Sequence, residues 1–190
     1  MKAIRAGLDY DKVIEAAAKL ADQDGLDKLS MATLATELGV QSPTLYHYVA
    51  GLTGLRRALT LFGLKQLTTT LGYAVMGKAG DEAVLALAQA MRCFGKEHPG
   101  LYAAVQTAPD PTDSEWLNAG RIVVDIMSRA FAAYKLSPKD TQHAIRVLRI
   151  IVDGCISLEK VGGFGLPLEV DETLRRLLAS FLSYLNNGTI

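Results

Sequence analysis

The stretch SMATLATELGVQSPTLYHY, residues 30–48, decides how the N-terminal part of this chain folds. Its apolar residues recur at helical spacing on both sides of a turn at Gly39. Ser30 is a candidate N-cap for the first helix. Ser42 is a candidate N-cap for the second, with Pro43 at the first helical position, where its missing N–H would have had no partner. Two short helices joined by a tight turn are the arrangement that a helix-turn-helix requires.

The second of these helices is predicted to have one apolar and one polar face. Its apolar residues fall at i, i+3 and i+4 and are expected to face the core; they are Leu45, Tyr48 and Val49. The opposite surface then carries short hydrogen-bonding side chains, those of Ser42, Thr44 and His47. A polar outer face of this kind is typical of a helix that contacts another molecule through hydrogen bonds.

In the major groove of DNA these side chains have specific partners. Thr44 can contact a thymine methyl group or a base edge, and His47 can reach a base or a phosphate. Tyr46, beside the polar face, can donate its hydroxyl to the phosphate backbone. Two short helices with a glycine turn also occur in many helical domains that bind no nucleic acid. The spacing alone therefore leaves both interpretations open.

Helical spacing continues along the rest of the chain, and no stretch shows strand-like alternation. The sequence predicts an all-α fold of about nine helices, with a three-helix head at the N-terminus. A longer helix over about 52–71 links the head to a C-terminal helical domain, and the glycine-bearing stretch 72–80 ends it. The other helices are expected at about 9–24, 81–97, 102–106, 114–134, 137–161 and from 171 onward.

The composition excludes several classes of function. Twenty basic and twenty acidic residues give zero net charge, so no global field attracts nucleic acid or an anionic membrane. The motifs of zinc, di-iron and phosphate-loop sites are absent from the sequence, and neither enzymatic activity nor a metal or cofactor is expected. No long apolar run or signal-peptide pattern is present, and Cys93 and Cys155 fit reduced thiols. A cytoplasmic protein without a membrane partner is expected.

Residues 14–59 resemble the DNA-binding domain of the TetR family of bacterial transcriptional regulators. In that family an alanine pair precedes a glycine, a Ser/Thr-Met pair opens the second helix, and Leu-Gly-Val precedes a Leu-Tyr pair. The matching positions are Ala16-Ala17, Gly25, Ser30-Met31, Leu38-Gly39-Val40 and Leu45-Tyr46. The run from Ser42 to Tyr46 is especially similar to the tetracycline-repressor branch.

This resemblance implies a function and a role for individual residues. It implies a sequence-specific repressor that a small molecule releases from a double-stranded DNA operator, with a DNA-binding domain over 1–52 and a ligand-binding and dimerisation domain over 53–190. Ser42, Pro43 and Thr44 would approach bases, and Tyr46 would approach a phosphate. Ser30 would contact the DNA backbone at the start of the second helix.

Two departures from the family's pattern favour an alternative. Family members usually carry a basic residue where Ala32 stands and a lysine where this chain has Leu52, so two phosphate contacts are missing. Residues 1–60 contain seven basic and seven acidic residues, and the head is neutral as a whole. The alternative is a TetR-fold binding module that has lost DNA recognition and acts through protein contacts.

The last two predicted helices are candidates for a homodimer interface. The helix over 137–161 is apolar on more than one side, and a second subunit would supply the missing cover. Residues 146–178 resemble the C-terminal domain of the tryptophan-histidine-glycine branch of the family, with Asp153-Gly154 in place of His-Gly, which implies a dimer four-helix bundle. The residues expected at the interface are Leu148, Ile151, Cys155, Leu174, Leu178, Phe181 and Leu182.

Aromatic and flexible side chains in the central helices are suited to enclosing a small, partly apolar effector. The candidates are Phe94, Tyr102, Trp116, Met127 and Phe131. Aromatic residues at helical spacing are more often ordinary core, so the effector pocket and the packed core stay open as alternatives.

Overall fold

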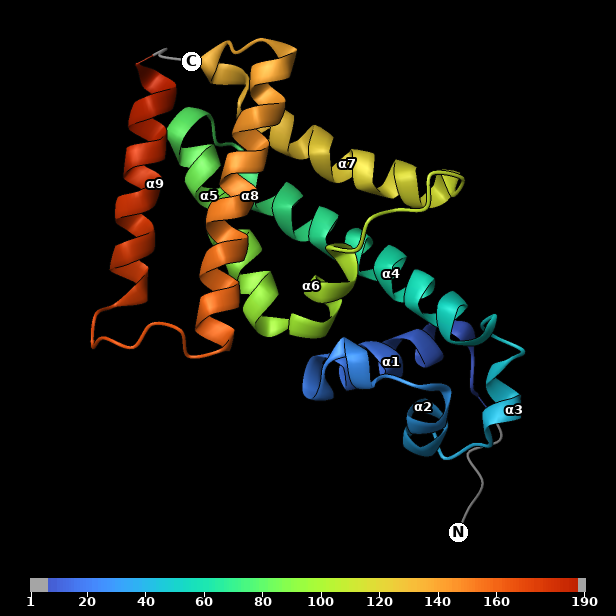
Figure 1. The fold of residues 1–190 in the computed structure, drawn as a ribbon. Helices are drawn as coiled ribbons and strands as arrows, with labels where there is room; N and C mark the ends of the chain where they lie inside the picture. The colour runs from blue at the N-terminus through green and yellow to red at the C-terminus, as the bar shows by residue number, and fades with distance from the viewer. Residues whose placement is uncertain (1–6, 188–190) are drawn as a thin grey trace. The chain divides into compact units, whose positions relative to one another are not determined.

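The computed structural model describes residues 7–187, and this part of the chain is helical, with turns and loops but no strand (Figure 1). Its α-helices are α1 (Tyr10–Asp24), α2 (Met31–Glu37), α3 (Ser42–Leu45), α4 (Gly51–Val75), α5 (Gly80–Glu97), α6 (Pro99–Val105), α7 (Ser114–Ala130), α8 (Pro138–Lys160) and α9 (Val170–Asn186). Short 3₁₀ turns, η1 (Leu26–Lys28) and η2 (Ala132–Tyr134), follow α1 and α7. The predicted all-α fold is confirmed.

Contacts within the chain group the helices into two compact units. Unit 1 consists of Met1–Gln66 and Glu97–Gly120, which contain α1 to α3, most of α4, α6 and the start of α7. Unit 2 consists of Leu67–Lys96 and Arg121–Ile190, which contain most of α5, the rest of α7, α8 and α9. This grouping follows packing; the division by function at residue 52 stays a prediction.

The core of unit 1 forms around α1. Val13 and Ala17 of α1, Leu34 of α2 and Leu55 of α4 have no exposed surface. Full burial of an aliphatic side chain of this size stabilises the fold by about 1.5–3 kcal/mol. The helix ends are specified locally as well, since the Asp9 carboxylate accepts a hydrogen bond from the backbone N–H of Lys12 at 2.9 Å and so caps α1.

The linking helix α4 is longer than predicted. It runs to Val75, and Gly72, where the break was expected, lies inside the helix. The chain turns only at Gly77 and Gly80, which both adopt positive φ, 73° and 56°. A left-handed backbone, and not the mere presence of glycine, ends the helix here.

Helices α8 and α9 pack side by side in unit 2 (Figure 1). Leu148 and Val152 of α8 have no exposed surface. Phe181 of α9 meets Phe131 edge to face, with the ring centroids 6.2 Å apart. The apolar stripe of α9 is therefore core of the single chain.

Packing within the chain uses much of the apolar surface of α8 and α9, and the role of the predicted interface residues in a homodimer stays a prediction. Each of the following is at most 8% exposed in the single chain and has little surface left for a second subunit: Leu148, Cys155, Leu174, Leu178, Phe181 and Leu182. Ile151, at the edge of the core, is half-buried. The apolar side chains that stay exposed on these helices are Val147, Ile150, Leu158, Leu177 and Tyr184.

A buried ionic cluster joins three helices of unit 2. Arg92 of α5, 5% exposed, donates to Glu159 of α8 at 2.7 and 2.9 Å and forms an ion pair with Asp171 of α9 at 2.6 Å. Lys96 donates to the same Glu159 carboxylate at 3.2 Å. The hydrogen bonds from Arg92 lower the pKa of Glu159 to about 2. Two-point contact through a guanidinium fixes these helices more specifically than apolar packing alone.

Candidate nucleic-acid interface

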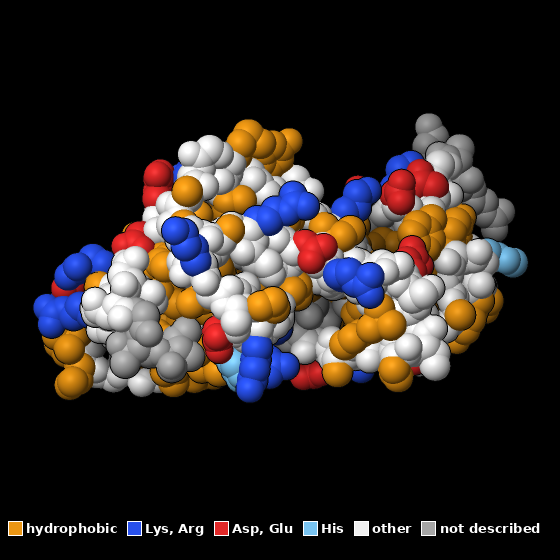
Figure 2. Space-filling model, turned by 90° about the horizontal axis from the view of Figure 1, so that it is seen from above, with side chains coloured by type: hydrophobic (Ala, Val, Ile, Leu, Met, Phe, Trp, Pro, Cys, Tyr) orange, Lys and Arg blue, Asp and Glu red, His pale blue; other side chains and the backbone are white. Residues whose placement is uncertain are grey.

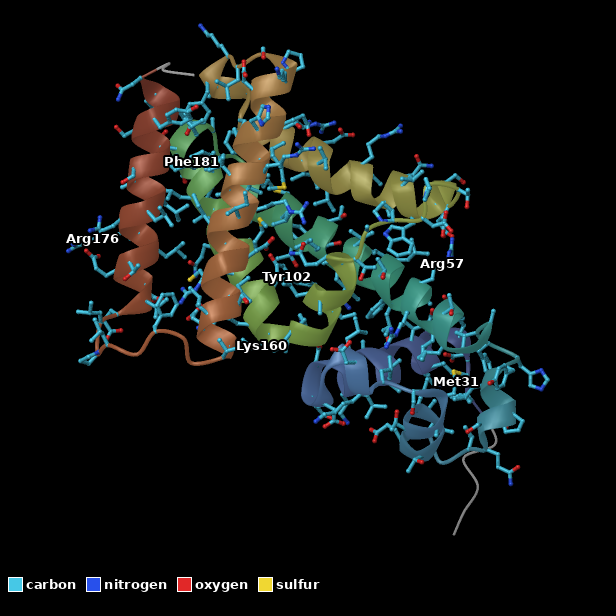
Figure 3. The ribbon with its side chains drawn as sticks, viewed as in Figure 1. Met31, Arg57, Tyr102, Lys160, Arg176 and Phe181 are labelled. Carbon is cyan, nitrogen blue, oxygen red and sulfur yellow. The ribbon has the colours of Figure 1, made fainter. Side chains whose placement is uncertain are left out.

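Helix α2 begins with a capping box. The Ser30 side chain accepts a hydrogen bond from the backbone N–H of Thr33 at 3.1 Å, and the Thr33 hydroxyl oxygen accepts one from the backbone N–H of Ser30 at 3.0 Å. The predicted N-cap is confirmed, and Met31 is the first helical residue (Figure 3). Ser30 stays partly exposed beside this helix start.

Helix α3 begins one residue earlier than predicted. Gln41 is its N-cap, Ser42 is its first residue and Pro43 its second, because the carbonyl of Gln41 already accepts a hydrogen bond from the N–H of Thr44 at 2.9 Å. Proline is compatible with both positions, since neither N–H would have an intrahelical partner. The turn before α3 passes through Gly39, whose φ of 64° suits glycine.

The apolar face of α3 and of the turn that follows packs into unit 1 as predicted. Leu45 has no exposed surface and Val49 is 6% exposed. Tyr48 is half-buried, and its hydroxyl donates to the backbone carbonyl of Leu8 at 3.1 Å. The segment before α1 is thereby tied to the end of the helix-turn-helix, a contact that no local sequence signal indicates.

The opposite face of α3 points outward. Pro43 and His47 are exposed, and the Tyr46 side chain is 61% exposed, unusually high for a tyrosine in a compact unit. Ser42 and Thr44 are half-buried beside them. Five side chains, three of them hydroxyl-bearing, thus lie on the outer side of α3 and of the turn that follows it, whereas Leu45 is fixed in the core.

This surface has few cations to offer to phosphates. Helices α2 and α3 contain no Lys or Arg. Arg57 of α4 binds the start of α7, donating to Asp113 at 2.9 Å and to Glu115 at 2.7 Å (Figure 3). This contact lowers the pKa of Asp113 to about 2 and raises that of Arg57. On the face seen in Figure 2, basic and acidic side chains are interspersed over the molecule.

Both halves of the chain match descriptions of one family. Residues 13–59 match the description "Bacterial regulatory proteins, tetR family", and residues 84–181 match "Tetracyclin repressor-like, C-terminal domain". The HTH-type transcriptional regulator YobS of Bacillus subtilis is 32% identical over 188 residues, which are 98% of this chain and 98% of YobS. This chain belongs to the TetR family.

Solved structures show the same fold. A protein from Rhodococcus sp. RHA1 is 25% identical, with a TM-score of 0.80 over 97% of this chain and all of that one. A variant of TetR from Acinetobacter baumannii AYE, in complex with minocycline, is 22% identical, with a TM-score of 0.72 over 95% of this chain and 98% of that one. As a TetR-family protein, the chain is a DNA-binding transcriptional regulator and not an enzyme.

The TetR-family assignment gives the two unusual positions of the sequence a structural setting. Ala32, where relatives usually carry a basic residue, is exposed on the first turn of α2. Leu52, in place of the usual lysine, is half-buried at the start of α4. The lost charge at Ala32 therefore changes the protein's surface, whereas Leu52 adds apolar contact within unit 1.

The five residues predicted to line an effector pocket lie in both units of this TetR-family chain. In unit 2, Phe94, Met127 and Phe131 are at most 3% exposed. In unit 1, Tyr102 is 6% exposed and Trp116 is half-buried. Burial of this degree fits pocket lining and core equally, so their role in effector binding stays a prediction.

Within residues 7–187, no helix is long and apolar enough to cross a membrane. Within the same range, no three His, Cys, Asp or Glu side chains are grouped so that they could hold a metal ion. The outward face of α3 is the feature on which a function can be built.

Proposed function

We propose that this regulator is a repressor that binds a palindromic DNA operator as a homodimer and is released by a small, partly apolar effector. The observation that carries the proposal is the outward face of α3, where Thr44, Tyr46 and His47 stand opposite the buried Leu45. A helix anchored on one side and polar on the other can enter a major groove without unfolding its own core.

Hydrogen bonds replace cations in the proposed DNA contacts. Ser42, Pro43 and Thr44 approach base edges, and His47 approaches a base or phosphate. The exposed hydroxyl of Tyr46 donates to a phosphate, and Ser30 adds a contact at the start of α2.

An exposed apolar stripe on α8 and α9 supports the homodimer. Val147, Ile150, Leu158 and Val161 lie on one side of α8 at near-heptad spacing with the exposed Gly154, and Leu177 and Tyr184 lie on α9. A stripe at this spacing is suited to packing against two helices of a second copy. Binding of such a dimer to a palindromic operator would require its two α3 helices to lie roughly 34–36 Å apart, the spacing of successive major grooves.

Two findings support repression and release. The C-terminal part of the chain matches a description that is tetracyclin repressor-like. The TetR variant of A. baumannii, which shares the fold, is in complex with minocycline. The buried aromatic and methionine side chains of the body supply the apolar surface that an effector of this kind requires.

Operator binding is tested with labelled duplexes from the DNA upstream of the protein's own coding region. We expect Thr44→Ala to reduce discrimination at one base position by about 1–3 kcal/mol and Tyr46→Phe to weaken all duplexes alike. Fluorescence anisotropy at constant salt measures both. Tyr73→Phe is the matched control, since Tyr73 is 71% exposed but lies near the end of α4. Unchanged binding in both α3 variants would contradict the assignment of α3.

Release by an effector has its own expected result. A compound that binds only one conformation of the C-terminal domain should lower the affinity for the operator about 5- to 150-fold. By linkage, bound operator should lower the affinity for the compound by the same factor. Minocycline is the first compound to test, by anisotropy of the labelled operator with and without drug. A compound that saturates the protein and leaves operator affinity unchanged is not the effector.

One observation favours a second function. Because α3 lacks Lys and Arg and Arg57 is held by two carboxylates, the same surface is also suited to a protein partner. Loss of DNA recognition would appear as equal, weak binding to all duplexes at low salt. In that case the TetR fold would serve as a protein-binding module.

A further inference from the structure

Helix α6 begins directly on the end of α1, and the cap of α6 comes from α1. The Asp22 carboxylate accepts hydrogen bonds from the backbone N–H groups of Gly100 at 2.8 Å and Leu101 at 3.0 Å. Its second oxygen lies 3.1 Å from Nδ1 of His98. His98, the N-cap residue of α6 by position, makes no side-chain cap bond of its own. An aspartate 78 residues away in sequence therefore satisfies the start of this helix.

Backbone meets backbone at this junction. A Cβ atom at Gly100 would lie 2.2 Å from the carbonyl carbon and 2.3 Å from the carbonyl oxygen of Ala21. Neither atom belongs to a side chain that can rotate away, so any residue other than glycine would push α6 off α1. The backbones of the two helices therefore approach each other too closely at Gly100 to admit a Cβ atom.

The other end of α6 is fixed to α4. The hydroxyl of Thr60, 2% exposed, donates to the carbonyl of Ala104 at 3.2 Å. A Cβ atom at Gly63 would lie 2.8 Å from Cγ1 of Val105 and 3.4 Å from the carbonyl oxygen of Leu101. Both ends of α6 are thus held by the helices that also frame the helix-turn-helix of unit 1, since α1 packs against α2 as well.

An open groove of about 340 Å³ runs beside the junction. It is lined by residues of α1, α4 and α6, among them Lys19, Asp22, Phe62 and His98. α1 and α6 pack closely against each other, with Ala21 and Leu101 each 1% exposed. Beside the open groove, the hydrogen bonds of Asp22 add to this packing. We call the contact between the Asp22 carboxylate and the N–H groups of Gly100 and Leu101 the latch.

We propose that Asp22 is a positioning residue that makes α6 move with the DNA-binding helices as one rigid piece. With the latch closed, a shift of α1 on DNA is transmitted to α6, and a displacement of α6 tilts α1 and, through α2, the recognition helix α3. Asp22 itself touches neither DNA nor effector. This inference rests on the proposed function, because it assigns a route by which operator binding reaches the body.

Hydrogen exchange of the full-length protein, with and without an upstream DNA duplex that the wild type binds, tests the inference. In wild type, saturating duplex should slow exchange in the peptide covering Pro99–Val105 by about fivefold or more, although α6 does not touch the DNA. In Asp22→Leu, the amides of Gly100 and Leu101 should exchange about tenfold faster without DNA, and the slowing by DNA should disappear.

Further variants separate a latch from general instability. Asp22→Asn keeps one acceptor oxygen and should retain part of the slowing of hydrogen exchange that DNA causes in α6. It also tests the inference if Asp22→Leu fails to fold. Asp24→Asn makes the same charge change two residues away, at an exposed position, and should behave as wild type. All variants are compared at equal occupancy of the duplex, so a mere loss of affinity does not alter the readout.

The outcomes distinguish the two proposals. A wild-type protein that binds no upstream duplex overturns the proposed function and this inference with it. Binding by wild type without any slowing in α6, or with slowing that Asp22→Leu retains in full, overturns the latch alone. Slowing that falls from wild type through Asp22→Asn to Asp22→Leu supports it.

Discussion

Ile150→Glu is expected to convert the proposed homodimer into a folded monomer with at least hundredfold weaker self-association. Ile150 is 71% exposed at the centre of the α8 stripe, so the single chain tolerates glutamate there. In the proposed dimer, each carboxylate would be buried without a partner, which costs about 3–5 kcal/mol. Sedimentation at micromolar concentration, with circular dichroism of the same samples, measures assembly and folding separately.

Two controls sharpen this result. Ala179→Glu introduces the same charge at an exposed position of α9, away from both the core and the stripe, and should leave the dimer intact. Leu178→Glu places the charge at a site only 5% exposed in the single chain and should unfold the protein. A wild-type protein that sediments as a folded monomer would refute the homodimer.

Arg92→Met is expected to destabilise the body by about 3–5 kcal/mol, because it leaves the carboxylate of Glu159 largely buried opposite an apolar chain. The Glu159 side chain is 17% exposed, and Lys96 is then its remaining cationic neighbour in the cluster. Urea unfolding measures the change. Arg175→Met, which breaks a solvent-exposed pair on α9, is the matched control and should change the free energy of unfolding far less than Arg92→Met does.

The pH dependence of this difference has a defined sign. The pKa of Glu159 falls from an ordinary value of 4.5 to about 2 in the folded protein, so its contribution to stability is complete above pH 4.5 and is lost as the pH falls towards 2. The difference in free energy of unfolding between wild type and Arg92→Met should therefore become smaller as the pH is lowered from 5 to about 3. If this difference does not change with pH, Arg92 stabilises the protein through packing and not through its charge.

Local signals predicted the helix-turn-helix well. The cap at Ser30 and the turn at Gly39 lie within three or four residues of the groups they act on, so the sequence contains both partners of each interaction. The start of α3 was wrong by one residue, because Pro43 fits the first and second helical positions equally. The roles of Ser42, Thr44 and Tyr46 on DNA stay predictions.

Long-range partners are what the sequence did not reveal. Asp22, Arg57 and Arg92 find their partners 56 to 79 residues away, and nothing in their neighbourhood marks them. For a related reason, the sequence does not show which side of α9 faces the core, and the predicted interface residues stay a prediction. Leu177 and Leu178 are adjacent in a stripe, yet one is 48% exposed and the other 5%, because the rotation of α9 against its neighbours decides which side is core.

The absence of Lys and Arg from α2 and α3 has a consequence for how the proposed repressor would search a genome. Non-specific affinity for DNA comes almost entirely from cations that displace counterions at phosphates, and here Arg57 is engaged by Asp113 and Glu115 while α3 has no cation of its own. A genome offers on the order of 10⁶–10⁹ competing sites, which normally hold most copies of a basic regulator. A protein that those sites hold weakly leaves a larger share of its copies free, and fewer molecules per cell then suffice to keep one operator occupied.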